Sequence, residues 1–434
     1  MRMKVKIFGA GLAGAEAAWQ AAKRGAKVTL YEMKPREFSP AHSNPNFAEL
    51  LCSNSLKSND PNTASGLLKN ELRALDSMLI SVADSCAVPA GSALAVDRDL
   101  FAQKVTEKLK NEKNIEIRNE IVSDIAVEDD EVLIIATGPL THQKLLPSLQ
   151  NLLGEEFLHF FDAVAPIITA DSIDFDSAFI GGRYGKGDDY VNCPMNKAEF
   201  KYFWEELVKA ETANVKDFEN NVFESCMPIE VMAKRGEDTI RFGPLKPVGL
   251  FDERKNERPY AVLQLRKENA SGTIYNLVGF QTHLTFGEQK RVFSLIPALK
   301  NAEFVRYGVM HKNTFINSPK TLDKFFRLKS NPRIFFAGQI AGVEGYVESI
   351  ASGLMCGINA VNTLLDKQLT EFENQTMIGA LAEYISSPNS DFQPMNANFG
   401  ILPPIEGKYK DKQSKRAALS ERAAESLKKS IKGV

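Results

Sequence analysis

A glycine-rich turn near the start of the chain constrains the fold most. Residues 5–8 are apolar and predict a buried strand, and the alanine-rich segment 15–23 predicts a helix. Between them, Gly9, Gly11 and Gly14 have the spacing GxGxxG. The first glycine permits a tight turn, the second lets the backbone approach a pyrophosphate, and the third lets helix and strand pack closely. We therefore expect a helix N-terminus that binds phosphate.

A second predicted strand, residues 27–31, ends at Glu32. In dinucleotide-binding folds a carboxylate at about this distance from the turn holds ribose hydroxyls. The two features together predict a site for an adenine dinucleotide. The expected contacts are Glu32 and the whole turn, Gly9, Ala10, Gly11, Leu12, Ala13 and Gly14.

Two later segments favour FAD over NAD as this dinucleotide. Residues 132–135 predict a buried strand that runs into Thr137 and Gly138, as in flavoproteins. No second glycine fingerprint in a strand, turn and helix context indicates a nicotinamide site.

The other flavoprotein-like segment is a predicted strand at residues 333–336 that runs into Gly338 and Gln339. It continues through Gly345 into an apolar helix, so we expect a second helix N-terminus to face the flavin. Tyr346 in this turn is a candidate to stack on the isoalloxazine, although packing alone accounts for it equally well.

The predicted strands of the dinucleotide fold come from both ends of a chain of 434 residues, which exceeds one ordinary domain. We expect an α/β protein with a discontinuous Rossmann-like FAD-binding domain, residues 1–165 and 331–405. An α+β domain is expected as an insertion at residues 166–330. Residues 406–434 are expected to form a basic tail or helix.

The charge of the chain is polarised. Residues 408–432 contain nine Lys or Arg and three acidic residues, although the net charge of the whole chain is −2. Such a segment attracts phosphates in a salt-dependent way, and a solvated terminal helix is the alternative.

The five cysteines are odd in number, scattered and without a CxxC pair. This pattern argues against a disulfide framework and against a zinc site, and it favours a reducing compartment. The apolar stretch at the N-terminus is interrupted well before the roughly 18 residues that a membrane span needs. We therefore expect a cytoplasmic protein with no membrane partner.

Three cysteines are candidates for chemistry. Cys52 lies in a small polar loop where backbone amides favour a thiolate, Cys193 precedes a proline, and Cys226 lies in the segment ESCMP. Cys86 and Cys356 lie among small apolar residues and are expected to be buried and inert. The residues alone do not choose among the first three.

Seven motifs spread over nearly the whole chain resemble the TrmFO family, which is related to the MnmG (GidA) family. They are GAGLAG at 9–14, FAELLCSNSLKS at 47–58, PAGSALAVDRDLF at 89–101, FESCMPIEVMAKRG at 223–236, RFGPLKPVGL at 241–250, GFQTHLTFGEQKRVF at 279–293 and AGQIAGVEGYVESIASG at 337–353.

The resemblance implies a folate- and FAD-dependent tRNA (uracil-5-)-methyltransferase that binds the T-arm and forms 5-methyluridine at T-loop position 54. The one-carbon unit of 5,10-methylenetetrahydrofolate passes to N5 of reduced FAD, with NAD(P)H as the reductant, and then to C5 of a uridine activated by a thiolate at C6. By motif position Cys226 resembles this nucleophile, and Cys52 resembles the second active-site cysteine that guards or traps the methylene-flavin. The base that removes the C5 proton is left open among Cys52, Glu344 and Glu348.

Four further residues lie in matching motifs and are candidates to hold phosphate or folate carboxylates, or else to form structural ion pairs. They are Arg98, Arg241, Lys246 and His283. Three functional alternatives remain: the same chemistry on ribosomal RNA, the wobble-uridine chemistry of the MnmG family, and an FAD oxidoreductase or binding module without an RNA substrate. We expect a monomer or weak oligomer, and the sequence does not distinguish NADH from NADPH.

Overall fold

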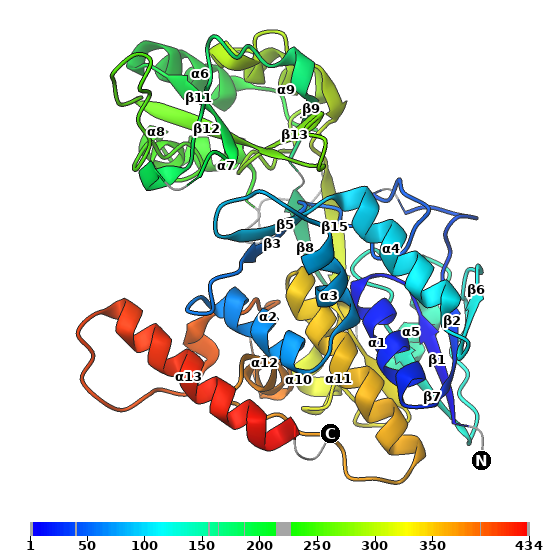
Figure 1. The fold of residues 1–434 in the computed structure, drawn as a ribbon. Coiled ribbons are helices and arrows are strands. Elements are labelled where there is room, and N and C mark those ends of the chain that lie inside the picture. Colours follow the sequence, from blue (N-terminus) through cyan, green and yellow to red (C-terminus); the bar gives the residue numbers. More distant parts are fainter. Residues whose placement is uncertain are drawn as a thin grey trace.

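A five-stranded parallel sheet is the framework of the larger of two lobes in the computed structural model (Figure 1). Its strands, in spatial order, are β16 (Ile334–Phe336), β7 (Glu131–Ile135), β1 (Lys4–Phe8), β2 (Lys27–Tyr31) and β6 (Ile115–Arg118). All neighbours pair in parallel, so the carboxyl ends of the central strands meet at one edge. Because β16 comes from late in the chain, the predicted discontinuous Rossmann-like α/β lobe is confirmed.

Helices cover the sheet of the larger lobe, and a small sheet of β3, β5 and β4 lies where this lobe meets the smaller one (Figure 1). The structure describes residues 3–39, 41–154, 157–163, 165–185, 187–213, 227–390 and 392–431. The other elements of this lobe are β3 (Ser55–Ser58), β4 (Ala87–Val88), β5 (Ala93–Val96), α1 (Leu12–Lys23), α2 (Ala64–Ala74), α3 (Met78–Ser85), α4 (Arg98–Asn111), α5 (Leu146–Leu153), α10 (Ser318–Thr321), α11 (Tyr346–Leu364), α12 (Met377–Ser386) and α13 (Lys412–Ile431).

The smaller lobe is built on a six-stranded antiparallel sheet with its own apolar core. In spatial order the strands are β10 (Phe179–Ile180), β11 (Tyr190–Met195), β12 (Ala261–Lys267), β13 (Ile274–Leu277), β9 (Ile167–Thr169) and β14 (Phe304–Arg306). Its helices are α6 (Lys197–Lys209), α7 (Ile229–Lys234), α8 (Glu237–Arg241) and α9 (Phe286–Phe293). Asn196 and Glu199 form a capping box at the start of α6.

Two antiparallel strands, β8 (Leu158–Ala163) and β15 (Met310–Phe315), join the lobes. After β15 the chain returns to the larger lobe, because Ile316, Leu322 and Phe326 are buried in the same apolar core as the parallel sheet. We therefore propose that the inserted domain ends near β15 rather than at residue 330, where the sequence pattern had placed its end.

Helices α1 and α11 cross at very short range beneath the glycine turn. A Cβ atom added at Gly353 of α11 would lie 2.1 Å from the Ala13 carbonyl oxygen of α1, and one at Gly357 would lie 2.6 Å from that of Ala17. Only glycine at these positions lets the two backbones touch. The crossing brings the N-termini of both helices to the carboxyl edge of the sheet.

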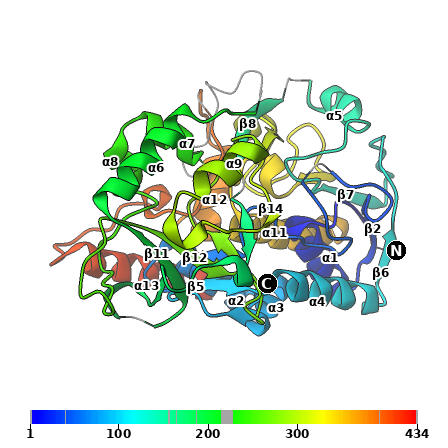
Figure 2. The same cartoon turned by 90° about the horizontal axis from the view of Figure 1, so that it is seen from above.

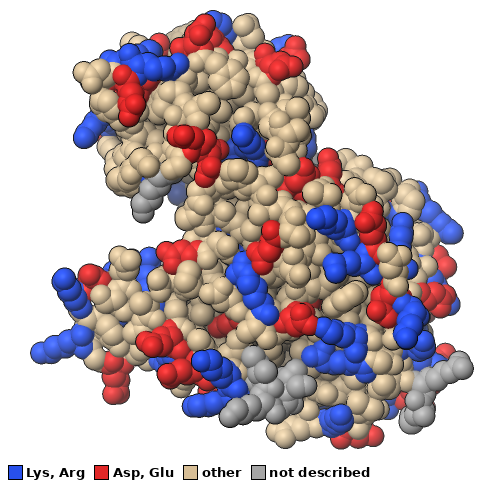
Figure 3. All heavy atoms as spheres, in the orientation of Figure 1, with Lys and Arg blue, Asp and Glu red and all other residues tan. Residues whose placement is uncertain are grey.

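The basic C-terminal segment forms a helix that is docked on the larger lobe. Leu419, Ala423 and Leu427 of α13 are buried in the core of that lobe, and the Ser420 hydroxyl donates to the Pro61 carbonyl at 2.9 Å. The charged side chains point outward, and Figure 3 shows positive and negative groups interspersed on this face rather than one continuous basic surface. Among the described residues, none of the helices has both the length and the apolar character of a membrane span.

We predict that Gly353→Ala lowers the free energy of unfolding by about 3 kcal/mol, because its methyl group overlaps the backbone of α1. Urea-induced unfolding measures this loss. The matched control is Gly287→Ala in α9, where the new methyl group meets no atom within 4 Å, so helix propensity should leave stability equal or raise it by up to about 1 kcal/mol. Equal effects of the two substitutions would contradict the close crossing.

Candidate active site

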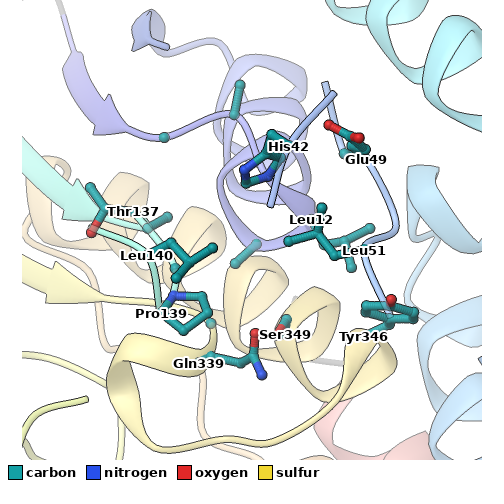
Figure 4. Close-up of a pocket in the computed structure, with 18 of the residues that line it drawn as sticks. Leu12, His42, Glu49, Leu51, Thr137, Pro139, Leu140, Gln339, Tyr346 and Ser349 are labelled. Carbon is teal, nitrogen blue, oxygen red and sulfur yellow. The ribbon is translucent and has the colours of Figure 1, made fainter. Parts of the chain in front are cut away.

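A cavity of about 640 Å³ lies at the carboxyl edge of the parallel sheet, between the N-termini of α1 and α11. This volume is in the range of small-molecule and cofactor sites. Figure 4 shows Thr137 and Leu140 on one side of the cavity, Leu51 and Tyr346 on the other, and Gln339 and Ser349 along the α11 side. Both helix N-termini offer unpaired amide groups and a positive dipole end to an anionic ligand.

Most of the cofactor-binding residues predicted from the sequence line this cavity, and so does one of the two predicted catalytic cysteines. They are Gly9, Ala10, Gly11, Leu12, Ala13, Glu32, Cys52, Thr137, Gly138, Gly338, Gln339, Gly345 and Tyr346.

The three glycines of the turn have different surroundings. A Cβ at Gly9 would lie 2.5 Å from the Ala136 carbonyl oxygen, and one at Gly14 only 1.8 Å from the Gly9 carbonyl oxygen. One at Gly11 would meet no atom within 4 Å, although Gly11 lines the cavity. Gly9 and Gly14 thus serve packing within the protein, and Gly11 leaves space on the cavity side. Gly14 itself is not among the lining residues.

Glu32 is buried at the cavity wall, and both its carboxylate oxygens accept backbone hydrogen bonds. Ala10 N donates to Oε2 at 2.8 Å, and Lys34 N donates to Oε1 at 3.0 Å. The carboxylate therefore fixes the glycine turn relative to the end of β2. It has a structural role in addition to the ribose contact that the sequence predicted.

Cys52 lies on a loop whose backbone is hydrogen-bonded to Tyr346. The Tyr346 hydroxyl accepts from Cys52 N at 2.7 Å and from Ser53 N at 3.1 Å. Burial raises the pKa of Tyr346, so the phenol is neutral at ordinary pH. The Tyr346 ring was predicted either to stack on a flavin or only to pack, and its hydroxyl also anchors the loop.

Arg98 differs from its predicted cofactor-binding role, because it does not line the cavity. Its guanidinium donates to the Leu50 and Leu51 carbonyls at 2.7 and 3.2 Å, and to Glu268 Oε2 of the smaller lobe at 2.7 Å. Arg98 therefore clamps the Cys52 loop and the smaller lobe together. A sequence motif locates such an arginine but not the direction of its side chain.

The other candidate cysteines differ in position. Cys193 is fully buried in the core of the smaller lobe, and burial raises its pKa, so it is an inert thiol. Cys86 and Cys356 are buried as expected. Cys226 lies outside the described residues. Cys52 is half-buried at the cavity wall, which leaves Cys52 and Cys226 as the candidates.

Comparison with known proteins decides the family. A family model described as glucose inhibited division protein A matches residues 4–368. Methylenetetrahydrofolate–tRNA-(uracil-5-)-methyltransferase TrmFO of Acetivibrio thermocellus is 57% identical over 430 residues, covering 98% of both chains. The TrmFO protein of Desulfitobacterium hafniense is 56% identical over 426 residues, covering 98% of this chain and 97% of its own.

The chain belongs to the TrmFO family. The resemblance drawn from the seven motifs is thereby confirmed. Two crystal forms of Aquifex aeolicus GidA share the fold, each with a TM-score of 0.71 at 16% identity. They match 99% of this chain and 73% and 76% of their own.

Glu344 and Glu348, the two carboxylates that remain candidates for the catalytic base, both line the cavity. Glu344 accepts from the Gln339 amide at 2.9 and 3.0 Å. Glu348 accepts from Ala397 N at 2.9 Å and lies 3.6 Å from Lys57 Nζ. The Glu348 Oε2 atom is buried without a hydrogen-bond partner in the described part of the chain, so it is an available acceptor.

The remaining motif residues lie elsewhere in this TrmFO chain. Arg241 stacks on the Tyr260 ring at 3.9 Å, His283 pairs with buried Glu230, and Lys246 does not line the cavity. Several polar lining residues were not predicted from the sequence, because only the folded chain brings their side chains to one cavity. They are Lys34, His42, Glu49, Lys57, Glu120, His142, Gln281, Asn313 and Asn396.

We predict that Tyr346→Phe lowers the free energy of unfolding by about 2 kcal/mol, because two backbone amides lose their shared acceptor. Urea titration of proteins with equal ligand content provides the measurement. Tyr202→Phe, at a position that is 56% exposed, should change stability by less than about 0.5 kcal/mol. A Tyr346→Phe variant as stable as this control would show that the hydroxyl does not anchor the loop.

Proposed function

We propose that the chain is a folate- and FAD-dependent methyltransferase that forms 5-methyluridine in tRNA. The observation that carries the proposal is the position of Cys52, which lines the same cavity as the glycine turn. A thiol beside a dinucleotide-sized site suits an enzyme that joins thiolate and flavin chemistry. The names of the TrmFO relatives state tRNA and methylenetetrahydrofolate as the reactants of those proteins.

The cavity residues fit FAD. Cβ atoms at Gly11 and Gly138 would meet no atom within 4 Å although both residues line the cavity, so the protein leaves backbone surface open to a ligand there. The turn from Gly9 to Ala13 would hold the pyrophosphate, and Glu32 the ribose end. The segment of Gly338, Gln339, Gly345 and Tyr346 would hold the flavin end. When bound, FAD supplies electrons and a carrier for the one-carbon unit.

The chain's own thiols supply the activation of uracil. C5 of a uridine is too weak a nucleophile until a thiolate adds to C6 and pushes electrons toward C5. Cys226 is proposed as this nucleophile from its motif, with Cys52 as the second thiol at the cavity. After the new bond to C5 forms, the C5 proton leaves to a base, for which Cys52, Glu344 and Glu348 are the candidates that line the cavity.

A second cavity of about 590 Å³ supports RNA as the substrate. Lys412, Lys415 and Arg416 of α13 line it, and Ala397 lines both this cavity and the first one. Phosphates bound along these cations would lead a nucleotide toward Cys52. We propose the T-loop uridine at position 54 in the T-arm as the target, NAD(P)H as the reductant, and a cytoplasmic monomer or weak oligomer as the working form.

We predict that Gly11→Val lowers flavin affinity at least tenfold, because the added side chain occupies the open cavity surface. The flavin-free variant should unfold at the same urea concentration as the flavin-free parent. Gly14→Val should instead destabilise the flavin-free protein, since its side chain overlaps the Gly9 carbonyl. Unchanged flavin content in Gly11→Val would place the cofactor elsewhere.

We predict that Cys226→Ala and Cys52→Ala each reduce transfer of label from methylenetetrahydrofolate to unmodified tRNA by about a thousandfold. Cys86→Ala, at a buried site away from the cavity, is the matched control and should retain transfer. A transcript with cytidine at T-loop position 54 should accept no label. Label in ribosomal RNA alone would favour the alternative RNA substrate, and NAD(P)H oxidation without RNA label would favour a plain oxidoreductase.

A further inference from the structure

The loop that carries Cys52 is held from both lobes. Tyr346 and Arg98 contact it from the larger lobe, as described above. From β12 of the smaller lobe, Arg266 Nη2 donates to Ser53 Oγ at 2.6 Å and Nε donates to Asn54 Oδ1 at 3.0 Å. The Asn54 amide returns a hydrogen bond to the Lys267 carbonyl at 2.9 Å. Ser53 and Asn54, the two residues that follow the thiol, are therefore fixed by the inserted lobe.

Positive charge exceeds negative charge around this loop. Arg98 pairs with Glu268 at 2.7 Å, and this carboxylate is buried. Arg266 is 7% exposed and donates to neutral atoms, and Arg306 of β14 has buried Nε and Nη2 atoms without hydrogen-bond partners. Among the described residues, neither Arg266 nor Arg306 has a carboxylate within 4 Å. Buried guanidinium groups without a counter-ion are costly, so an anion is expected nearby.

The two lysines that line the cavity each lie near a carboxylate, and Glu32, Glu120 and Glu344 line the cavity as well. Lys34 lies 3.4 Å from Glu49, and Lys57 lies 3.6 Å from Glu348. Glu344 accepts two hydrogen bonds from the neutral Gln339 amide. None of these contacts involves Arg266 or Arg306.

Cys52 directly precedes Ser53, to which Arg266 donates, and its thiol is able to carry a negative charge. Burial and the neighbouring Arg98 charge lower the pKa of Arg306 to about 10, which leaves it charged at neutral pH, and Glu268 and Cys52 oppose that decrease. Tyr346 is neutral because burial raises its pKa. Cys52 lines the cavity, whereas Arg266 and Arg306 do not. A ligand in the cavity therefore adjoins Cys52 and not the two arginines.

We propose that Arg266 and Arg306, both supplied by the inserted lobe, are positioning residues that hold Cys52 as a thiolate at neutral pH. The thiol proton passes to the buffer, and the sulfur keeps the electron pair. The consequence is that the reactivity of Cys52 depends on the inserted lobe being docked. The proposal deepens the proposed function, since Cys52 is one of its two thiols, but its test measures ionisation and not methylation.

The test is the rate of carbamidomethylation of Cys52 by iodoacetamide as a function of pH, in which the thiolate displaces iodide. The full-length protein is reduced, freed of reductant and used with its bound flavin, and peptide mass spectrometry separates Cys52 from Cys226. In the parent protein we expect an apparent pKa well below the value of about 8.5 for an ordinary thiol. Arg306→Gln and Arg266→Gln should each slow labelling at pH 7 at least threefold, and the double variant at least tenfold.

Two matched variants separate charge from structure. Arg306→Lys keeps the charge and should label at a rate within about threefold of the parent. Glu268→Gln removes the carboxylate that pairs with Arg98. It should lower the apparent pKa of Cys52 further, whereas the arginine-to-glutamine variants should raise it. Arg291→Gln on α9, a surface residue paired with Glu206 and Glu288, should leave the profile unchanged.

An apparent pKa of about 8.5 or above in the parent would overturn the proposal. So would an unchanged profile in folded Arg266→Gln and Arg306→Gln variants that retain flavin. If inorganic phosphate raises the melting temperature of the parent but not of Arg306→Gln while Cys52 titrates normally, the arginines form an anion site instead. If the glutamine variants do not fold, the downward shift expected for Glu268→Gln and the near-parental rate expected for Arg306→Lys still decide the matter.

Discussion

The close crossing of α1 and α11 is the contact on which the rest of the structure depends. Gly353 lets the α11 backbone touch the α1 backbone at Ala13, directly beneath the glycine turn. This contact brings two helix N-termini to one edge of the sheet although their sequences lie far apart. The cavity lies between those two helix ends. Glu32 is hydrogen-bonded to Ala10 beside the first end, and the Cys52 loop is hydrogen-bonded to Tyr346 at the second.

The Cys52 loop is also where the two lobes meet. Arg98 binds its backbone and reaches Glu268, while Arg266 binds its side chains from the opposite lobe. The short polar segment that follows the thiol has little intrinsic order, so these hydrogen bonds determine its conformation. The same guanidinium groups place positive charge near the sulfur. The same arginine contacts therefore determine both the position of the thiol and its electrostatic environment.

The main cavity and the cavity beneath α13 share a lining residue. Ala397 lines both, with Cys52 in the first cavity and Lys412 and Arg416 in the second. The α13 segment contributes only because its apolar face is buried against the larger lobe. Membership of the TrmFO family agrees with this combination, since its members act on tRNA with a folate by name.

The sequence by itself determined the Rossmann-like lobe, the glycine turn and the end of β2 at Glu32, because these depend on local periodicity and on glycines at fixed spacing. It also identified the family through motifs. Only the tertiary structure decided that Cys193 is buried, that Arg98 clamps two lobes and that Tyr346 anchors the Cys52 loop. These depend on side-chain direction and on contacts between residues more than a hundred positions apart, which no local pattern encodes.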